Sequence, residues 1–372
     1  MQPIAESNPP RRILVRGVNW LGDAVMTTPA MMRLRERFPG ARIALLTPEK
    51  LEGLWRNHPA VDGVIAFKAG DSFLSTSRRL RAGNFDVALL FPNSPRSALE
   101  AWLARIPMRI GYARPWRTGF LTQPIPTRPG HARMRKRSAA EIRGLAAGAA
   151  NRTAASDAAS HQVHEYLHLA AALGANPEPV PPQLFVAAGE IEEARNKFAL
   201  AGITNPVFGL NPGAEFGPAK RWPVERFIAA AQEIQRRTHC LWLILGGKGD
   251  AGIAGRVESA FQAQGAVVKN LAGRTSLREL CALLKSCRVV LTNDSGPMHA
   301  AAALGTPVVA LFGSTDPRLT GPGLPGDSRH RLLQSDAPCS PCFRRECPID
   351  FRCMNGIGVD RVVDAVVGAL KR

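Results

Sequence analysis

The stretch VVLTNDSGPMHAAAALGTPVVALFGSTDP, residues 289–317, decides the fold class of this chain. It opens with β-branched and apolar residues, continues into an alanine-rich segment that starts at Ser295, and closes with a second apolar run. A strand, a helix and a second strand in this order are typical of a βαβ unit, whose two strands are parallel. The stretch therefore predicts an α/β protein built on parallel sheets.

The same alternation of apolar runs and helical segments extends along the whole chain. The apolar runs occupy 13–15, 42–47, 63–67, 86–91, 206–213, 240–247, 289–296 and 308–314. Helices are expected at 24–38, 224–237, 277–286 and, as the closing element, 358–372. Two such series predict two doubly wound domains, residues 1–178 and 179–372. The proline-rich stretch ANPEPVPPQ (175–183) is the expected linker, since its prolines disfavour both helix and central strand.

One region, residues 128–160, fits neither domain. Its first half, RPGHARMRKRSAAEIR (128–143), carries six Lys and Arg against one Glu and has few bulky apolar side chains. Such a segment buries too little surface to become ordered alone, so we expect a basic, flexible insertion in the first domain. The alternative is a basic arm that approaches anionic lipid or a phosphorylated acceptor.

The charge balance favours an anionic partner. The chain holds 48 Lys and Arg against 30 Asp and Glu, a net charge of +18. The sequence has no zinc-finger spacing, RNP motif or heptad-linked basic helix, so nucleic acid is not the expected partner. We expect no transmembrane segment, because no apolar run approaches about 18 residues. The polar start MQPIAESNPPRR lacks the apolar core of a secretory signal, so a cytoplasmic location is expected.

Polar residues follow the strand expected at 289–293. Asp294 comes directly after it, and Ser295 and Gly296 begin the next helix, with His299 in its first turn. The carboxyl ends of parallel strands and the N-terminus of a helix together form a common phosphate site. We expect Ser295 to cap the helix and Gly296 to allow close approach of the ligand. The alternative is a capped helix with an incidental histidine.

Two further loops follow strands in the second half. In NPGAEFGPAKRWPVERF (211–227), Lys220 suits a diphosphate as a mobile point charge, although a solvated basic loop is the alternative. In LGGKGDAGIAG (245–255), Asp250 is placed to accept hydrogen bonds from ribose hydroxyls, although an ordinary turn explains the glycines equally well.

The first strand leads into a different kind of turn. The segment ILVRGVNWLGDAVMTTPAM (13–31) predicts a strand, a turn and a helix with Pro29 near its start, but Gly17 and Gly22 do not form the G-x-G-x-x-G spacing. Asp23 would repel a phosphate at this helix start. We therefore expect the first domain to hold no nucleotide, and Asp23 to remove a proton from an acceptor hydroxyl.

Four cysteines crowd the segment CSPCFRRECPIDFRC: Cys339, Cys342, Cys347 and Cys353. The spacing C-x2-C-x4-C-x5-C is not a common zinc pattern, so reduced structural thiols are expected, with a metal cluster as the alternative. The remaining three cysteines, Cys240, Cys281 and Cys287, are expected to be core thiols.

Taken together, RGVNWLGDAVMTTPAM, NPGAEFGPAKRWP and TNDSGPMHAAAALGTPVVALFGSTDP resemble the lipopolysaccharide heptosyltransferases of glycosyltransferase family 9. The tail CSPCFRRECPIDFRCM is most similar to the heptosyltransferase II branch. The resemblance covers nearly the whole chain except residues 128–160. It implies a GT-B fold, in which two Rossmann-like domains face a central cleft and the C-terminal domain holds the donor.

The resemblance also implies an activity. The expected reaction is the inverting transfer of L-glycero-D-manno-heptose from ADP-heptose onto the first heptose of the lipid A–Kdo inner core. No metal or other cofactor is expected to be required. The acceptor implies an enzyme peripherally associated with the cytoplasmic face of the inner membrane.

Site residues carry over from the family at matching positions. Asp23 matches the catalytic base, Lys220 the lysine that contacts the diphosphate, and Asp250 lies near an acidic residue that holds the ribose. The donor signature matches at Asp294, Ser295, Gly296 and His299. The family often has hydroxyl residues before the lysine, and here Ala214, Glu215 and Gly217 are expected to serve instead. Acceptor binding is expected of Arg16, Asn19 and Trp20.

Other readings of the same residues remain open. The first is heptosyltransferase I, or another family 9 enzyme with a different acceptor. A sugar-nucleotide epimerase would also bind a nucleotide in the second half, but would need no acceptor. A non-enzymatic anion-binding module would explain the charge alone.

Overall fold

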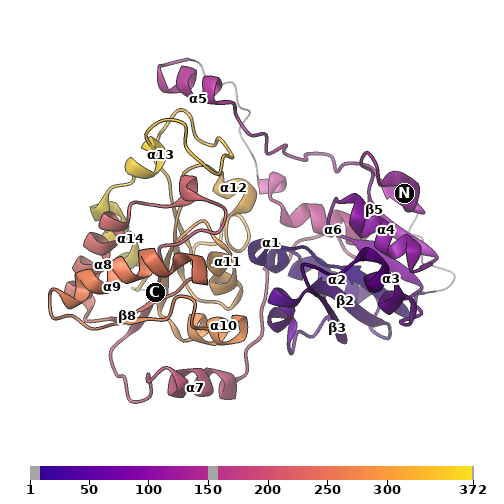
Figure 1. Ribbon diagram of the computed structural model, residues 1–372, viewed down its shortest axis with the longest axis horizontal. Coiled ribbons are helices and arrows are strands. Elements are labelled where there is room, and N and C mark those ends of the chain that lie inside the picture. The colour runs from indigo at the N-terminus through magenta and orange to yellow at the C-terminus, as the bar shows by residue number, and fades with distance from the viewer. Residues whose placement is uncertain (1–8, 150–157, 371–372) are drawn as a thin grey trace. The chain divides into compact units, whose positions relative to one another are not determined.

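The computed structural model describes residues 9–149 and 158–370, which form two compact units (Figure 1). Unit 1 extends to His131 and resumes over Ala159–Phe185. Unit 2 consists of Ala132–Ala158 and of the chain from Val186 onward. The chain therefore passes from one unit to the other three times.

Unit 1 is built on a parallel sheet of six strands with the order β3-β2-β1-β4-β5-β6. The strands are β1 (Arg12–Arg16), β2 (Arg42–Pro48), β3 (Gly63–Phe67), β4 (Val87–Leu90), β5 (Met108–Tyr112) and β6 (Gln123–Ile125). The central strands are rich in Ile, Leu and Val and are buried on both faces, as parallel sheets require. The order reverses between β1 and β4, and the carboxyl ends of these two strands mark the place where doubly wound sheets bind ligands.

Helices cover the sheet of unit 1 in two packed pairs. α2 packs against α6, and α3 lies beside α4 (Figure 1). The helices are α1 (Leu21–Met26), α2 (Thr28–Arg37), α3 (Phe73–Arg81), α4 (Pro95–Leu103) and α6 (Val163–Ala171), with the 3-10 turns η1 (Glu49–Trp55), η2 (Thr118–Phe120) and η3 (Ala158–Ser160).

Unit 2 repeats this topology. Its parallel sheet has the order β12-β11-β10-β7-β8-β9, which is the order of unit 1 traced from the other edge. The strands are β7 (Val207–Asn211), β8 (Leu241–Ile244), β9 (Val268–Asn270), β10 (Val289–Asn293), β11 (Val308–Leu311) and β12 (Arg331–Leu333). The order here reverses between β7 and β10.

The helices of unit 2 bury an aromatic core on its sheet. Phe208, Phe227 and Trp242 are fully buried there, and α14 packs against α8. The helices are α5 (Ala139–Ala146), α7 (Ala188–Lys197), α8 (Val224–Thr238), α9 (Ala251–Gln262), α10 (Leu277–Ser286), α11 (Gly296–Ala303), α12 (Pro317–Thr320), α13 (Arg352–Asn355) and α14 (Val359–Ala369), with η4 (Pro218–Lys220) and η5 (Lys248–Asp250).

The structure confirms the predicted α/β class and differs in one early helix. The helix expected at 24–38 is two helices, because Pro29 lacks the N–H that a continuous helix would need and clashes with the preceding turn. Thr27 separates them, and its hydroxyl donates to the Ala24 carbonyl at 2.7 Å.

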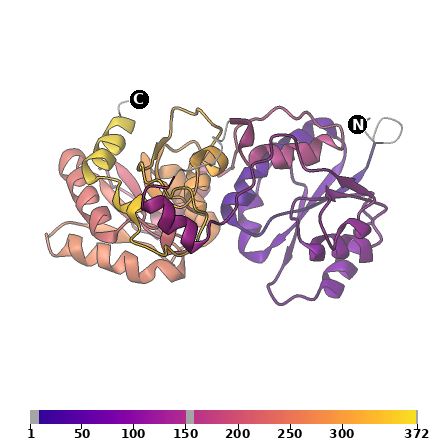
Figure 2. The ribbon, with the colours of Figure 1, turned by 90° about the horizontal axis from the view of Figure 1, so that it is seen from above.

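The division of the chain also differs from the expected 178/179 boundary and flexible insertion. Residues up to Phe185 belong to unit 1, and Ala132–Ala158 belongs to unit 2. Within the expected insertion, α5 is a regular helix that lies against the segment leading to α13 (Figures 1 and 2). Ile142 and Leu145 are buried there. Two apolar side chains are therefore enough to order this helix when another segment of the chain supplies the surface against which they pack. Residues 150–157 of the insertion lie outside the described residues.

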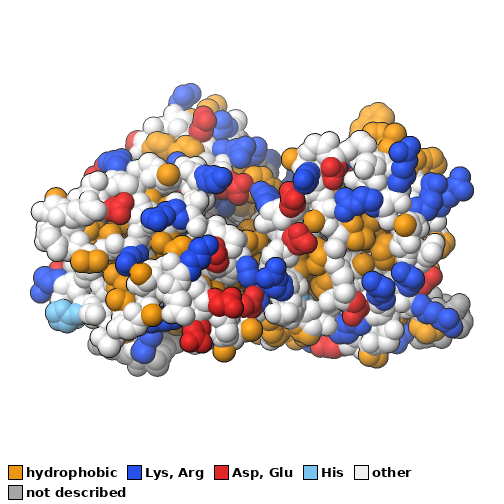
Figure 3. Space-filling model, turned by 60° about the horizontal axis from the view of Figure 1, so that its bottom comes forward, with side chains coloured by type: hydrophobic (Ala, Val, Ile, Leu, Met, Phe, Trp, Pro, Cys, Tyr) orange, Lys and Arg blue, Asp and Glu red, His pale blue; other side chains and the backbone are white. Residues whose placement is uncertain are grey.

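Lys and Arg side chains are spread over the face of the molecule shown in Figure 3. Over residues 9–149 and 158–370, the helices are all too short or too polar to cross a membrane.

Candidate active site

Lys220 and Asp294 meet where the strand order of unit 2 reverses. Lys220 follows β7 and Asp294 follows β10, and Lys220 Nζ lies 2.6 Å from Asp294 Oδ2. The same carboxylate oxygen accepts a hydrogen bond of 2.6 Å from the hydroxyl of Thr315, which follows β11. The side chains of Lys220 and Asp294 are only 13 % and 4 % exposed, so the charged pair is held in a largely dry setting. Lys220 and Asp294, which are more than 70 positions apart in the sequence, thus form one group.

The loop that carries Lys220 is tied to the sheet by Asn293. Its side-chain amide donates to the carbonyl of Pro212 at 2.8 Å, and its carbonyl oxygen accepts from the backbone N–H of Trp222 at 3.0 Å. Asn293 therefore holds both ends of the loop 212–222. Asn293 was not among the residues predicted to form the site, although its position at the end of a buried strand was the available signal.

Ser295 does not act as the predicted helix cap. It stands at the N-cap position of α11, but its side chain makes no capping hydrogen bond. Its hydroxyl instead accepts from Asn211 Nδ2 at 2.8 Å and lies 3.0 Å from the hydroxyl of Thr292. Asn211 is the last residue of β7 and Thr292 lies one residue before the end of the neighbouring strand β10, so this contact fastens the start of α11 to the sheet. Gly296 is the first residue of α11, and His299 lies in its first turn with a buried side chain.

Asp250 lies close to the Lys220 loop. Its Oδ2 accepts from the backbone N–H of Gly247 at 2.9 Å. A Cβ atom on Gly213 would lie 2.1 Å from Asp250 Oδ1, so the carboxylate packs directly against the backbone of the loop. Arg221 Nη2 lies 3.8 Å from the same Oδ1 and donates to the Ala214 carbonyl at 3.2 Å.

The three residues expected to replace the family's hydroxyls differ in their surroundings. Ala214 is buried, Glu215 is exposed and Gly217 is half-buried. Gly217 has a φ of 146°, a conformation that favours glycine. The structure thus brings five of the predicted residues to the carboxyl ends of the unit 2 strands: Lys220, Asp250, Asp294, Ser295 and Gly296.

Asp23 lies in unit 1, in the first turn of α1 after β1. Its Oδ1 accepts a hydrogen bond of 3.2 Å from Gln162 Nε2, which also donates to the hydroxyl oxygen of Tyr166 at 2.9 Å. Burial raises the pKa of Tyr166 well above its usual value, and the charge of Asp23 adds to this effect. The amide of Gln162, which the sequence analysis did not assign, therefore orients the carboxylate.

The predicted acceptor residues separate into two groups. Asn19 and Trp20 are exposed, and Lys50 Nζ lies 5.3 Å from the centre of the Trp20 ring. Arg16 is buried instead, which does not fit a direct role in acceptor binding. Its Nε lies 3.3 Å from Glu100 Oε2, and its Nη1 donates to the Gly17 carbonyl at 2.6 Å. The Arg16 side chain thus supports the turn before Asp23 through the Gly17 carbonyl.

The four clustered cysteines are free thiols. Cys339, Cys342 and Cys353 are buried, and burial raises their pKa values, that of Cys353 to about 12. Among the residues that the structure describes, no three His, Cys, Asp or Glu side chains are grouped so as to hold a metal ion.

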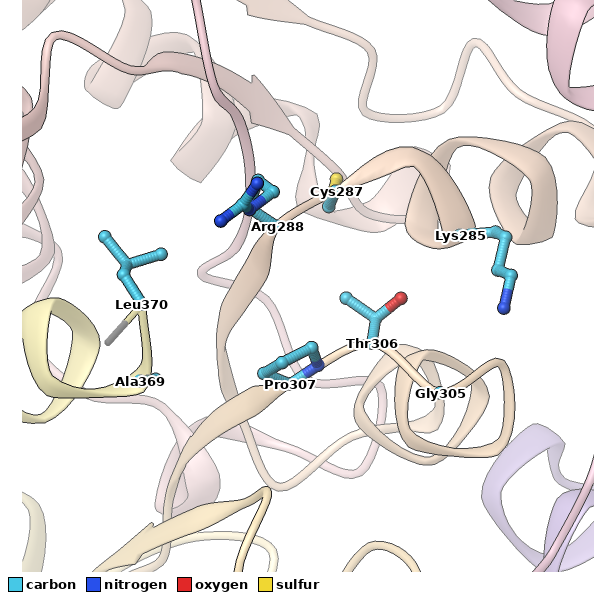
Figure 4. Close-up of a pocket in the computed structure, with 8 residues that line it drawn as sticks. All are labelled: Lys285, Cys287, Arg288, Gly305, Thr306, Pro307, Ala369 and Leu370. Carbon is cyan, nitrogen blue, oxygen red and sulfur yellow. The ribbon is translucent and has the colours of Figure 1, made fainter. Parts of the chain in front are cut away.

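A pocket of about 250 Å³ lies at the amino ends of the unit 2 strands (Figure 4). Arg288 and Pro307, which line it, immediately precede β10 and β11. Asp294 and Thr315 follow these strands at their other ends. The pocket is therefore separate from the group around Lys220.

The comparisons with known proteins agree with these features. Residues 119–351 match glycosyltransferase family 9 (heptosyltransferase), which is more than half of the chain. Lipopolysaccharide heptosyltransferase 2 of Salmonella typhimurium is 32% identical over 325 residues, which cover 84% of this chain and 85% of that protein. The Escherichia coli K12 protein of the same name gives the same identity and coverage.

A solved structure, that of E. coli ADP-heptose lps heptosyltransferase II, matches with a TM-score of 0.77 and 28% identity. The match covers 97% of this chain and 98% of that one. It supports the GT-B class that the two parallel sheets indicate. The chain is a glycosyltransferase and belongs to glycosyltransferase family 9.

Proposed function

We propose that this enzyme transfers L-glycero-D-manno-heptose from ADP-heptose onto the first heptose of the lipid A–Kdo inner core of lipopolysaccharide. The two relatives that match over 84% of the chain at 32% identity are named heptosyltransferase 2, and the matched structure is named for ADP-heptose. The observation that carries the proposal is the Lys220–Asp294 pair at the switch point of unit 2.

In the proposed reaction, unit 2 holds the donor. As the bond between heptose and ADP breaks, negative charge grows on the diphosphate. Lys220 and the free N–H groups at the start of α11 are the donors that stabilise this charge. Asp294 and Thr315 keep the lysine in place before the donor arrives. Donors fixed in this way avoid reorganisation during the reaction, and each is typically worth about 3–4 kcal/mol.

Unit 1 supplies the proposed base. The Asp23 carboxylate takes the proton of the acceptor hydroxyl while the oxygen attacks the anomeric carbon. Gln162 donates to Oδ1 of this carboxylate and so helps to orient it for the proposed role. General-base catalysis of this kind contributes about 10²–10⁴-fold to the rate.

The reaction is tested with ADP-heptose and a truncated core acceptor that ends in one heptose. We expect ADP release only when the acceptor is present, and an acceptor that gains the mass of one heptose. Conversion of the donor without acceptor would indicate an epimerase. Use of an acceptor that carries Kdo but no heptose would indicate a heptosyltransferase I.

We further propose that the enzyme attaches peripherally to anionic lipid through α3 and α4. Arg81 Nη2 donates to the Leu103 carbonyl and Ser77 Oγ donates to the Glu100 carbonyl, so the two helices lie side by side. Their outer surface carries apolar side chains that are 40–49 % exposed, namely Phe73, Leu74 and Trp102. Between positions 73 and 118 the chain has eight Arg and no Lys against two acidic residues. Exposed apolar side chains among arginines suit a negatively charged lipid surface, where each cation contributes about 1 kcal/mol.

Sedimentation with phosphatidylcholine vesicles, with and without phosphatidylglycerol, tests this attachment. We expect binding only to the anionic vesicles, weakened by salt and by the double variant Phe73→Ser/Leu74→Ser. Val267→Ser in unit 2 is the matched control, because Val267 is 66 % exposed and lies outside this surface. Equal loss in the control and the double variant would contradict the assignment of the surface.

A further inference from the structure

The segment with the four cysteines and the arm formed by residues 132–146 have no role in the reaction proposed above. The arm ends in α5, whose first turn is a capping box of Ser138 and Glu141. Ile142 and Leu145 on one face of α5 are buried against Cys339 and Cys342. The arm is therefore an ordered strap packed on the cysteine segment.

Three hydrogen bonds fasten the arm to that segment. The backbone N–H of Arg137 donates to the Cys342 carbonyl at 3.1 Å, and Arg344 Nη1 donates to the Arg137 carbonyl at 3.0 Å. At the far end of α5, Arg352 Nη1 donates to the Ala146 carbonyl at 3.0 Å. The cysteine segment thus holds the arm on both sides of α5.

The cysteine segment contacts the end of strand β11. The backbone N–H groups of Cys342 and Phe343 both donate to the Ser314 carbonyl, at 3.0 and 2.7 Å. Ser340 Oγ donates to the neighbouring Gly313 carbonyl at 2.6 Å. The next residue, Thr315, is the one whose hydroxyl holds Asp294.

Arg345 extends the same segment to the Lys220 loop. Its carbonyl accepts from the Ala219 N–H at 2.9 Å, and its Nε donates to the Phe216 carbonyl at 2.7 Å. Its guanidinium lies 5.5 Å from the centre of the Phe216 ring, and Lys220 Nζ lies 4.8 Å from the same ring centre. Arg345 therefore clamps the residues immediately before Lys220 by backbone, side chain and ring contacts.

We propose that Arg345 is a positioning residue for Lys220, and that the arm 132–146 holds the segment on which Arg345 is carried. This inference rests on the proposed donor site. A lysine has a flexible stem, so its value as a phosphate ligand depends on how firmly its backbone is placed. The arm thereby becomes a determinant of donor affinity.

The test is a double-mutant cycle on ADP affinity, measured by calorimetry with the full chain. Arg345→Ala keeps the main-chain bond to Ala219 and removes the contacts to Phe216. We expect it to weaken ADP binding about tenfold, with an unchanged melting temperature. In a Lys220→Met background the same substitution should have no further effect, because Arg345 acts through Lys220. Arg256→Ala, an exposed arginine on α9, is the control and should leave ADP affinity unchanged.

The arm is tested by Ile142→Ser with Arg143→Ser as its control on the exposed side of the same helix. Ile142→Ser should weaken ADP binding in the wild-type background and not in the Arg345→Ala background. The positioning role would be overturned if Arg345→Ala weakened ADP binding equally in the wild-type and the Lys220→Met backgrounds. It would also be overturned if Arg345→Ala left the ADP affinity of the wild type unchanged. If the wild-type chain bound no ADP, the proposed donor site itself would fail, and this inference with it.

Discussion

At the scale of single residues, the pairing of Lys220 with Asp294 explains how an acidic residue can belong to the proposed phosphate site. Alone, a carboxylate at the start of a helix would repel a diphosphate. Asp294 Oδ2 contacts both Lys220 Nζ and the Thr315 hydroxyl. Asp294 therefore holds the lysine in place, and the lysine offsets the negative charge of the carboxylate. The sequence could place both residues after strands, but it could not show that they touch.

The partners of other residues around the site could not be predicted from the sequence for the same reason. Arg16 was expected to bind the acceptor, yet its partner Glu100 stands 84 positions further on and keeps the guanidinium buried. Arg345 and the Phe216 carbonyl are separated by 129 positions. Local pattern finds side chains of the right chemistry, whereas their partners depend on tertiary packing.

His58 predicts a loss of stability in mild acid. Its ring packs between Trp55 and Phe185, and burial lowers its pKa from 6.5 to about 4. Between these values the unfolded chain binds a proton and the folded chain does not, so falling pH favours unfolding. From pH 7 to pH 5 this costs about 2 kcal/mol of the free energy of unfolding.

Urea unfolding at pH 7 and at pH 5 measures this loss in the free energy of unfolding. The wild type should lose about 2 kcal/mol more than His58→Leu over this interval. His239→Asn, at an exposed histidine of unit 2, should behave as the wild type. The same pH dependence in His58→Leu and the wild type would assign the effect to other groups.

At the scale of elements, the long buried strands and amphipathic helices were predictable, and short edge elements were not. The helix α10 has the bounds 277–286 that periodicity predicts. The edge strands β6, β9 and β12 have three residues each, too few to show an alternating pattern. Helix α5 was missed because its two buried side chains have their counterpart about 200 positions away.

The Lys220 loop makes a prediction for its own backbone. Gly217 has a φ of 146°, and a Cβ on it would lie 2.6 Å from the Arg345 carbonyl oxygen. Gly217→Ala must therefore displace the loop from Arg345, and we expect ADP affinity to fall at least about tenfold, or 1.4 kcal/mol.

The control for this change is Gly189→Ala in α7, where an added Cβ meets no atom within 4 Å. It should leave ADP binding unchanged and raise stability by about 0.5–1 kcal/mol, since alanine favours the helix. Calorimetry and urea unfolding measure the two effects. Unchanged ADP affinity in Gly217→Ala would show that the clamp is not needed for binding.

At the scale of the whole molecule, the two units share one strand order and carry different chemistry. In each unit the order reverses between the first and fourth strands, and in each the critical loop follows the first of these. In unit 1 that loop leads to Asp23, whereas in unit 2 it leads to Lys220. The lysine of the unit 2 loop has no counterpart in the turn of unit 1, which carries Asp23 instead, and this difference was visible in the sequence.

This division of chemistry predicts that catalysis and donor binding can be separated by one substitution. Asp23→Asn keeps the size of the side chain and its hydrogen bond from Gln162, but the amide cannot take a proton. Because Lys220, Asp250 and Asp294 all belong to unit 2, ADP should bind Asp23→Asn as it binds the wild type. Transfer should fall by about 10²–10⁴-fold.

Calorimetry with ADP and single-turnover transfer to the heptose-bearing acceptor measure the two quantities on the same preparation. Glu52→Gln, at an exposed acidic residue of unit 1, is the control and should keep both the ADP affinity and the transfer rate of the wild type. A residual base of lower strength would leave a transfer rate that rises with pH, so the rate is followed across neutral pH. Retained transfer with lost ADP affinity in Asp23→Asn would place Asp23 in the donor site and reverse the roles of the two units.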